Sequence, residues 1–188
     1  MGERVVLGID PGTGRMGWAI VGRSSVVSRQ SPVASGRSSV VGGWLNGPQT
    51  TNHRPQTNLV SCGLIETPPK TPVSKRLKVI YKEITKIVKK YQPTELAIEE
   101  LFFVKNVKTA ISVAQARGVV MLACELAKIP IFEYKPNEVK LAISGFGHAD
   151  KSQMRKMLKL HLKGCRIKQD DTVDAISVAL THLQINKK

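Results

Sequence analysis

Apolar and turn-forming residues alternate along the chain in a pattern of short strands followed by helices. Apolar runs rich in β-branched residues predict five strands, over residues 4–9, 17–21, 60–66, 95–99 and 131–134. Helices are expected over residues 75–91, 107–127, 137–143, 150–162 and 170–184. Ser74 is a candidate N-cap for the first of these helices. This order predicts an α/β domain in which a mixed β-sheet is flanked by helices.

A polar segment interrupts the pattern between the second and third strands. From about residue 23 to residue 58 the chain is rich in Ser, Gly, Gln, Thr, Asn and Pro, and Gly-Arg-Ser-Ser-Val-Val occurs at 22–27 and again at 36–41. Such a composition buries too little apolar surface to pack, so we expect a disordered insertion. The remainder of residues 1–188 is long enough for one domain with one core. Arginines in the insertion leave open whether it contacts a partner or is only a solvated loop.

The charge balance narrows the class of partner. Lys and Arg number 29 against 14 Asp and Glu, a formal net charge of +15, which favours a polyanionic partner. Two segments, 70–92 and 135–168, each carry a net charge of +7. No apolar run approaches the ~20 residues of a membrane span and no signal peptide is evident, so we expect a cytoplasmic protein without a membrane partner. Three scattered cysteines fit reduced thiols rather than a zinc site.

Four acidic residues stand where chemistry would use them. Asp10 and Glu99 each end an apolar strand, and Asp171 and Asp174 lie three residues apart on an apolar helix, hence on one face. Singly, each has an ordinary explanation: a turn residue at Asp10, a complement to the helix dipole at Asp171, or a solvated pair of Glu99 with Glu100. The combination within a basic chain favours the chemical interpretation.

Carboxylates gathered from three elements repel one another unless a cation neutralises them. Oxygen ligands without Cys or His indicate Mg²⁺ or Mn²⁺. Two such ions, ~3.5–4 Å apart, would activate water and stabilise the leaving oxygen in phosphodiester hydrolysis. The acids therefore predict a two-metal nuclease.

Spaced motifs then point to a known family. They are Leu7-Gly8-Ile9-Asp10-Pro11-Gly12-Thr13, Ala97-Ile98-Glu99-Glu100-Leu101-Phe102, Gln115-Ala116-Arg117-Gly118, Phe132-Glu133-Tyr134, Asp150-Lys151-Ser152-Gln153 and Asp171-Thr172-Val173-Asp174-Ala175. In this order they resemble the RuvC family of bacterial Holliday junction resolvases, over nearly all of the chain except about 23–58. The resemblance implies a single RuvC-like nuclease domain with an RNase H-like fold. It further implies a homodimer that nicks four-way junction DNA symmetrically with Mg²⁺ during recombination and repair, beside the RuvA and RuvB proteins.

The resemblance also assigns roles to individual residues. It implies that the metal-binding acids are Asp10, Glu99, Asp171 and Asp174, and that Lys140 and Lys151 are catalytic or bind the DNA backbone. Phe102 would stack on an unpaired base, with Lys105 nearby on the same DNA-binding segment. The helix that carries Arg117 would lie at the dimer interface; whether Arg117 contacts a DNA phosphate or forms an internal ion pair stays open.

Three other functions compete with this interpretation. The nearest is another RNase H-like nuclease that prefers a flap or an RNA–DNA hybrid. The Asp-Pro-Gly-Thr-Gly turn at residues 10–14 also resembles a phosphate-binding hairpin of actin-like ATPases, but no second hairpin is evident. A non-catalytic DNA-binding module would explain the charge and leave the acids unexplained. The lysines of 75–91 fit either a DNA contact or a solvated helix face.

Overall fold

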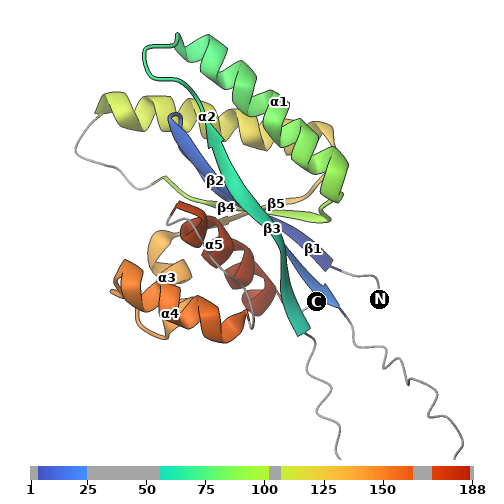
Figure 1. Ribbon diagram of the computed structural model, residues 1–188, viewed down its shortest axis with the longest axis vertical. Helices are drawn as coiled ribbons and strands as arrows, with labels where there is room; N and C mark the ends of the chain where they lie inside the picture. Colours follow the sequence, from blue (N-terminus) through green and yellow to red (C-terminus); the bar gives the residue numbers. More distant parts are fainter. Residues whose placement is uncertain (1–3, 25–55, 102–106, 163–170, 187–188) are drawn as a thin grey trace, which may run out of the picture.

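A five-stranded sheet in the order β3-β2-β1-β4-β5 forms the centre of the computed structural model, which describes residues 4–24, 56–101, 107–162 and 171–186 (Figure 1). The strands are β1 (Arg4–Asp10), β2 (Arg15–Ser24), β3 (Gln56–Glu66), β4 (Glu95–Glu99) and β5 (Ile131–Tyr134). The helices are α1 (Val73–Tyr91), α2 (Val107–Leu126), α3 (Pro136–Ser144), α4 (Lys151–His161) and α5 (Asp171–Ile185). β1, β2 and β3 pair antiparallel, whereas β1, β4 and β5 pair parallel. The predicted α/β domain with a mixed sheet is confirmed.

Helices cover both faces of the sheet (Figure 1). α1 and α2 pack on one face, and α5 packs on the other with α3 and α4 beyond it. Successive side chains of β1 serve both faces: Val6 belongs to the core under α5, whereas Leu7 and Ile9 belong to the core under α1 and α2. Burial on both sides explains why β1 reads as a continuous apolar run.

Two sequence expectations about element ends need correction. α1 begins at Val73, because the carbonyl oxygen of Pro72 already accepts hydrogen bonds from the backbone N–H groups of Lys75 (3.0 Å) and Arg76 (3.1 Å). Pro72 is therefore the N-cap, and Ser74 lies inside the first turn. β2 and β3 extend to Ser24 and Gln56, so both borders of the expected insertion are strand. Residues 25–55 lie outside the described part of the chain.

Deleting residues 25–55 and joining the strand ends by a short Gly-containing turn should leave the fold intact. Ser24 and Gln56 already pair across antiparallel strands, the arrangement that a hairpin turn closes. Shortening the connection between two strands lowers the entropic cost of closing it by ~0.6 kcal/mol per halving of its length, which favours the folded state slightly. We expect a melting temperature within a few degrees of the full chain. A drop of many degrees would mean that residues 25–55 contribute to the core.

α2 is long and apolar enough, by length and composition alone, to cross a membrane, which the sequence analysis did not anticipate. In the structure it packs against α1 and buries Ala116, Val120, Ala123 and Cys124 in the core beneath it. A second stripe of apolar residues on α2 remains exposed. Packing in the core therefore explains only some of the apolar residues of α2.

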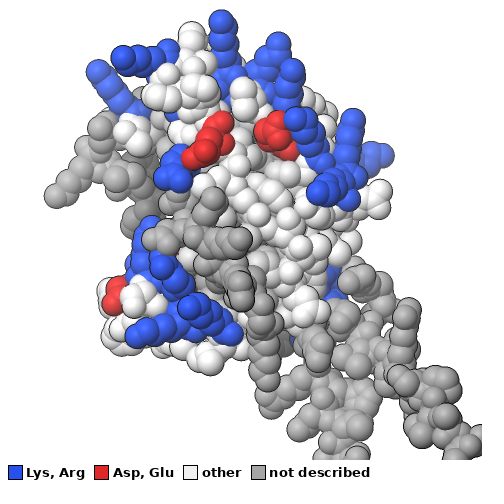
Figure 2. Space-filling view, viewed as in Figure 1, with Lys and Arg blue, Asp and Glu red and all other residues white. Residues whose placement is uncertain are grey.

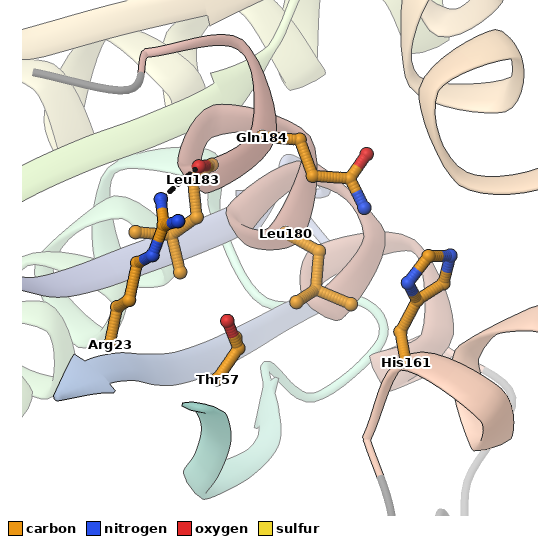
Figure 3. Close-up of a pocket in the computed structure, with 6 residues that line it drawn as sticks. All are labelled: Arg23, Thr57, His161, Leu180, Leu183 and Gln184. Atoms are coloured by element: carbon orange, nitrogen blue, oxygen red, sulfur yellow. Dashed lines mark hydrogen bonds between the residues drawn. The ribbon is translucent and has the colours of Figure 1, made fainter. Parts of the chain in front are cut away.

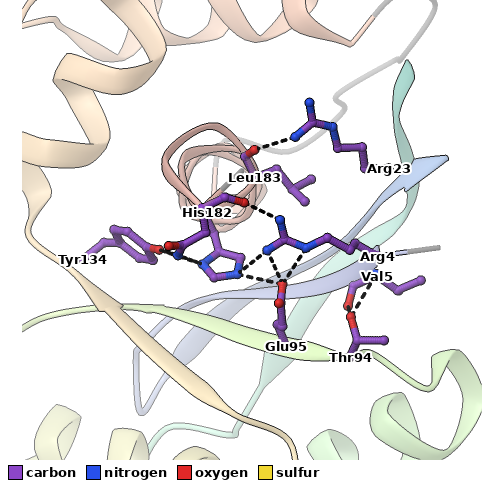
Figure 4. A network of polar contacts seen from close by, with 9 residues as sticks. Arg4, Val5, Arg23, Thr94, Glu95, Tyr134, His182 and Leu183 are labelled. Atoms are coloured by element: carbon purple, nitrogen blue, oxygen red, sulfur yellow. Dashed lines mark hydrogen bonds and ion pairs between the residues drawn. The ribbon is translucent and has the colours of Figure 1, made fainter. Parts of the chain in front are cut away.

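A polar network ties α5 to the edge where β1 begins (Figure 4). Glu95 Oε2 lies 2.7 Å from Arg4 Nη2 and 2.8 Å from His182 Nε2, and His182 Nδ1 lies 2.6 Å from the Tyr134 hydroxyl. Burial lowers the pKa of His182, which favours the neutral ring. A neutral ring with its proton on Nε2 donates to Glu95 and accepts from Tyr134. The network thereby joins β1, β4, β5 and the C-terminal end of α5.

Beside this network lies a pocket of about 470 Å³ (Figure 3). It is lined by Arg23, Thr57, His161, Leu180, Leu183 and Gln184. The Arg23 guanidinium donates a hydrogen bond to the carbonyl oxygen of Leu183 at 3.1 Å, next to the end of α5. Among the described residues, none predicted for the site lines this pocket, which belongs to the opposite end of α5 from Asp174.

Candidate active site

Asp10 and Glu99 end two neighbouring parallel strands. The register pairs Ile9 of β1 with Ile98 of β4, so the next residues along, Asp10 and Glu99, stand side by side. Both line a pocket of about 270 Å³ together with Thr109 of α2 and Pro136 of α3. The carboxyl ends of parallel strands are where open α/β sheets bind ligands. The predicted pairing of these two acids at one sheet edge is therefore present in the fold.

The turn after Asp10 is held by close backbone contacts. A Cβ atom at Gly12 would lie 1.9 Å from the carbonyl oxygen of Arg15, so only glycine fits there. The Thr67 hydroxyl donates to the carbonyl oxygen of Thr13 at 2.5 Å, and Arg76 Nε donates to Thr67 at 2.7 Å. These contacts fix the chain that follows Asp10.

α5 delivers a third acid to the same edge. Its residue Ala175 lies against Gly8 of β1, two residues before Asp10, and Asp174 adjoins Ala175. Asp174 Oδ2 lies 3.6 Å from Lys151 Nζ. Asp171 is the first residue of α5, one turn earlier, and its side chain lies outside the described part of the structure.

Glu99, Asp174, Lys140 and Lys151 line one pocket of about 390 Å³. Asp150 also lines it and caps α4, since Asp150 Oδ1 accepts a hydrogen bond from the Gln153 backbone N–H at 2.8 Å. This cap fixes the start of α4 and hence the position of Lys151. The pocket thus brings together two of the predicted acids and both predicted lysines.

Burial and the charge of Asp174 raise the pKa of Glu99 to about 7, and the charges of Lys140 and Lys151 oppose that rise. Two carboxylates that repel each other in this way are a donor set that fits a hard cation. Among the described side chains, no group of three or more His, Cys, Asp or Glu could hold a metal ion. Glu99 and Asp174 nevertheless fit such an ion by their oxygen chemistry and shared pocket.

Comparison with known proteins identifies the family. The family model for crossover junction endodeoxyribonuclease RuvC matches residues 50–182. The chain belongs to the RuvC family. It is 41% identical over 177 residues to the RuvC protein of Roseiflexus sp., covering 94% of this chain and 88% of that one. Members of this family are named as endonucleases, which confirms the sequence-based assignment to that class.

Solved structures agree with the RuvC assignment. Thermus thermophilus RuvC, solved in complex with a Holliday junction substrate, superimposes with a TM-score of 0.75 at 27% identity, covering 97% of this chain and 94% of that one. The yeast mitochondrial Holliday junction resolvase Ydc2 matches with a TM-score of 0.58 at 11% identity, over 95% of this chain and 78% of that one, and shares the fold. The predicted RNase H-like fold of the RuvC family is confirmed.

The structure does not place the remaining predicted site residues, Phe102, Lys105 and Arg117, in this pocket. Phe102 and Lys105 fall within 102–106, outside the described residues. Arg117 forms an ion pair with Glu133 of β5, so the structure favours the internal pair over a DNA contact. Sequence reasoning missed Thr109 and Asp150 as lining residues. The Asp-x-x-Gln capping pattern that starts at Asp150 is the signal that could have revealed the second.

Basic side chains gather in two regions of the face shown in Figure 2, one over α1 and one over α3 and α4. The exposed lysines of α1 are Lys75, Lys78, Lys82, Lys86, Lys89 and Lys90. Those of α4 are Lys151, Lys156 and Lys159. The α4 group adjoins the pocket with Glu99 and Asp174, because Lys151 belongs to both. A nucleic-acid backbone entering this pocket would therefore meet positive charge at its rim.

Proposed function

We propose that the pocket with Glu99, Asp174, Lys140 and Lys151 is the site where this RuvC-family endodeoxyribonuclease cuts four-way DNA junctions. The observation that carries the proposal is the convergence of β1, β4 and α5, each contributing an acid at one sheet edge, beside two lysines. Junction cleavage during recombination and repair is the activity that this combination of family and site supports best.

Asp10, Glu99, Asp171 and Asp174 are the proposed holders of Mg²⁺, with two ions per site and Mn²⁺ as a substitute. Bound metal would supply an activated water and stabilise charge on the leaving oxygen. Two observations support this ligand set. Asp10 and Glu99 end neighbouring strands, and Asp174 precedes Ala175, whose carbonyl oxygen lies against Gly8 of β1. The protein's part is to carry Asp10 and Glu99 at the ends of two paired strands and Asp174 on the helix packed against β1, which limits how far a bound cation would have to draw them together.

An immobile four-way junction with one labelled strand tests the function directly. We expect paired, symmetric nicks with Mg²⁺ and none in the presence of a chelator, because the carboxylates alone provide no cation. Linear duplex, flaps and RNA–DNA hybrids of matched sequence serve as controls. Preferential cleavage of a flap or hybrid would mean that this structure, and not the junction, is the substrate. Binding without nicking under any metal would mean that the protein is a DNA-binding module and not a nuclease.

Lys140→Ala and Lys151→Ala should lower the cleavage rate more than junction affinity. Both side chains line the pocket with Glu99, where they can neutralise charge that develops on the phosphate. We expect a loss of about 10²-fold in the single-turnover rate at saturating protein. Lys78→Ala on α1 is the matched control, and it should weaken binding at low salt without changing that rate. Wild-type rates in both pocket variants would remove these lysines from the catalytic set.

A homodimer through α2 is part of the proposal, because two symmetric nicks need two active sites. Ile111, Leu122 and Leu126 are 55%, 54% and 66% exposed, and their spacing places them on one stripe of the helix with Val107. A Cβ atom at Gly118 would meet nothing within 4 Å, so this stripe leaves room for close approach of a second helix. We further propose cooperation with RuvA and RuvB in the bacterial cytoplasm.

A further inference from the structure

One aromatic ring stands in solvent beside the proposed cleavage pocket. Phe146 is 63% exposed and belongs to the connection between α3 and α4. Both of these helices line the pocket, through Lys140 on α3 and Lys151 on α4, and so does Ala149 within the connection itself. An exposed phenylalanine at this place is not explained by packing of the core.

Hydrogen bonds hold the backbone of this connection. Gly145 adopts the left-handed conformation (φ 73°), and its N–H donates to the carbonyl oxygen of Leu141 at 2.9 Å, which ends α3. The Phe146 N–H donates to the Ser144 hydroxyl at 3.1 Å, and the Phe146 carbonyl oxygen accepts from the Ala149 N–H at 3.2 Å. Both backbone polar groups of Phe146, its N–H and its carbonyl oxygen, are therefore hydrogen-bonded within the connection.

The Phe146 and His148 rings form a T-shaped pair, with centroids 6.1 Å apart and planes 70° apart. One face of an aromatic ring held in this way can stack on a planar partner with little loss of conformational freedom. The surroundings specify the partner's charge, because Lys140 and Lys151 attract a phosphate to the adjoining pocket. A nucleobase meets both requirements, because it has a planar π-face and is linked to a phosphate through its sugar.

We propose that Phe146 stacks on an unpaired base of the junction strand whose phosphate enters the pocket between α3 and α4. The proposal rests on the proposed function, since it takes junction DNA as the ligand. Within a continuous duplex both faces of each base are covered by its neighbours, whereas at a crossover bases can leave the stack. Phe146 should therefore contribute to junction recognition and little to duplex binding.

The test compares Phe146→Ala, Phe146→Leu and Phe146→Trp on a four-way junction that carries 2-aminopurine near the crossover, with metal chelated so that no cleavage occurs. We expect Phe146→Ala and Phe146→Leu to weaken junction binding roughly tenfold and to lose the fluorescence change, while Phe146→Trp retains both. Linear duplex affinity should change less than twofold. Leu141→Ala, which removes another exposed apolar side chain (57%) from α3, is the matched control and should bind like the wild type.

Each other outcome overturns the inference. Wild-type junction binding by Phe146→Ala would exclude a contact. Wild-type binding by Phe146→Leu, together with a loss by Phe146→Ala, would indicate an apolar contact with the DNA instead of ring stacking. Equal losses on junction and duplex would indicate general DNA contact. Because these readouts need no cleavage, failure of the wild type to nick the junction with Mg²⁺ would overturn the proposed function separately.

Discussion

Glu99→Gln and Asp174→Asn should each abolish junction cleavage, with a rate loss of about 10³-fold or more, while junction binding survives. Each substitution keeps nearly the shape of the side chain and removes its charge, which a hard cation requires of its ligands. Glu99 and Asp174 share one pocket, and their mutual repulsion contributes to the raised pKa of Glu99. Removing one charge therefore ends the repulsion between the two carboxylates and, in the same step, disables the proposed metal site.

Cleavage and melting temperature measured on the same preparations separate loss of function from loss of fold. We expect melting temperatures no lower than that of the wild type, since an amide is less costly to bury than a repelled carboxylate. Glu83→Gln provides the matched control, because Glu83 lies on α1, where it pairs with Lys86 at 2.7 Å, and does not line the pocket with Glu99 and Asp174. If Glu99→Gln cut junctions at the wild-type rate, Glu99 would not belong to the catalytic set.

The fold could be predicted largely from local pattern. In α1 the buried residues Ile80, Ile84 and Ile87 recur at the three- and four-residue spacing that the sequence displays. Residues at three- and four-residue spacing lie on one side of a helix, so the apolar spacing predicts which side is buried. β4 was predicted with its observed bounds. A short apolar run that follows a proline-containing turn and ends in an acidic residue is typical of a buried strand.

Arrangement in space was harder to predict than the elements. Strand ends marked Asp10 and Glu99 as candidates, but only the sheet order β1-β4 makes them neighbours. That order follows from the crossover through α1, which composition does not specify. Arg117 finds Glu133 on another element, and neither local pattern nor charge count predicts such a partner. The strand ends at Ser24 and Gln56 are polar, so the hairpin they extend carries no apolar signal.

Replacing Gly8 by alanine should cost both stability and activity, because this glycine sets the distance between the two elements that carry Asp10 and Asp174. A Cβ atom at Gly8 would lie 2.2 Å from the carbonyl oxygen of Ala175 and 2.8 Å from the Cβ atom of Ala179. Neither a backbone carbonyl oxygen nor the Cβ atom of an alanine can yield by a change of rotamer, so α5 must move away from β1. Overpacking of this kind costs about 3 kcal/mol at the upper end of its usual range.

For a chain of this size, that loss corresponds to a fall of about 6–12 °C in melting temperature. Below the transition, displacement of α5 would also separate Asp174 from Asp10, and misplacement by about 1 Å can reduce a rate about 10²-fold. Gly147→Ala is the control, because a Cβ atom there meets nothing within 4 Å and the melting temperature should hold. A Gly8→Ala protein that melts and cleaves like the wild type would show that the contact between β1 and α5 does not position the acids.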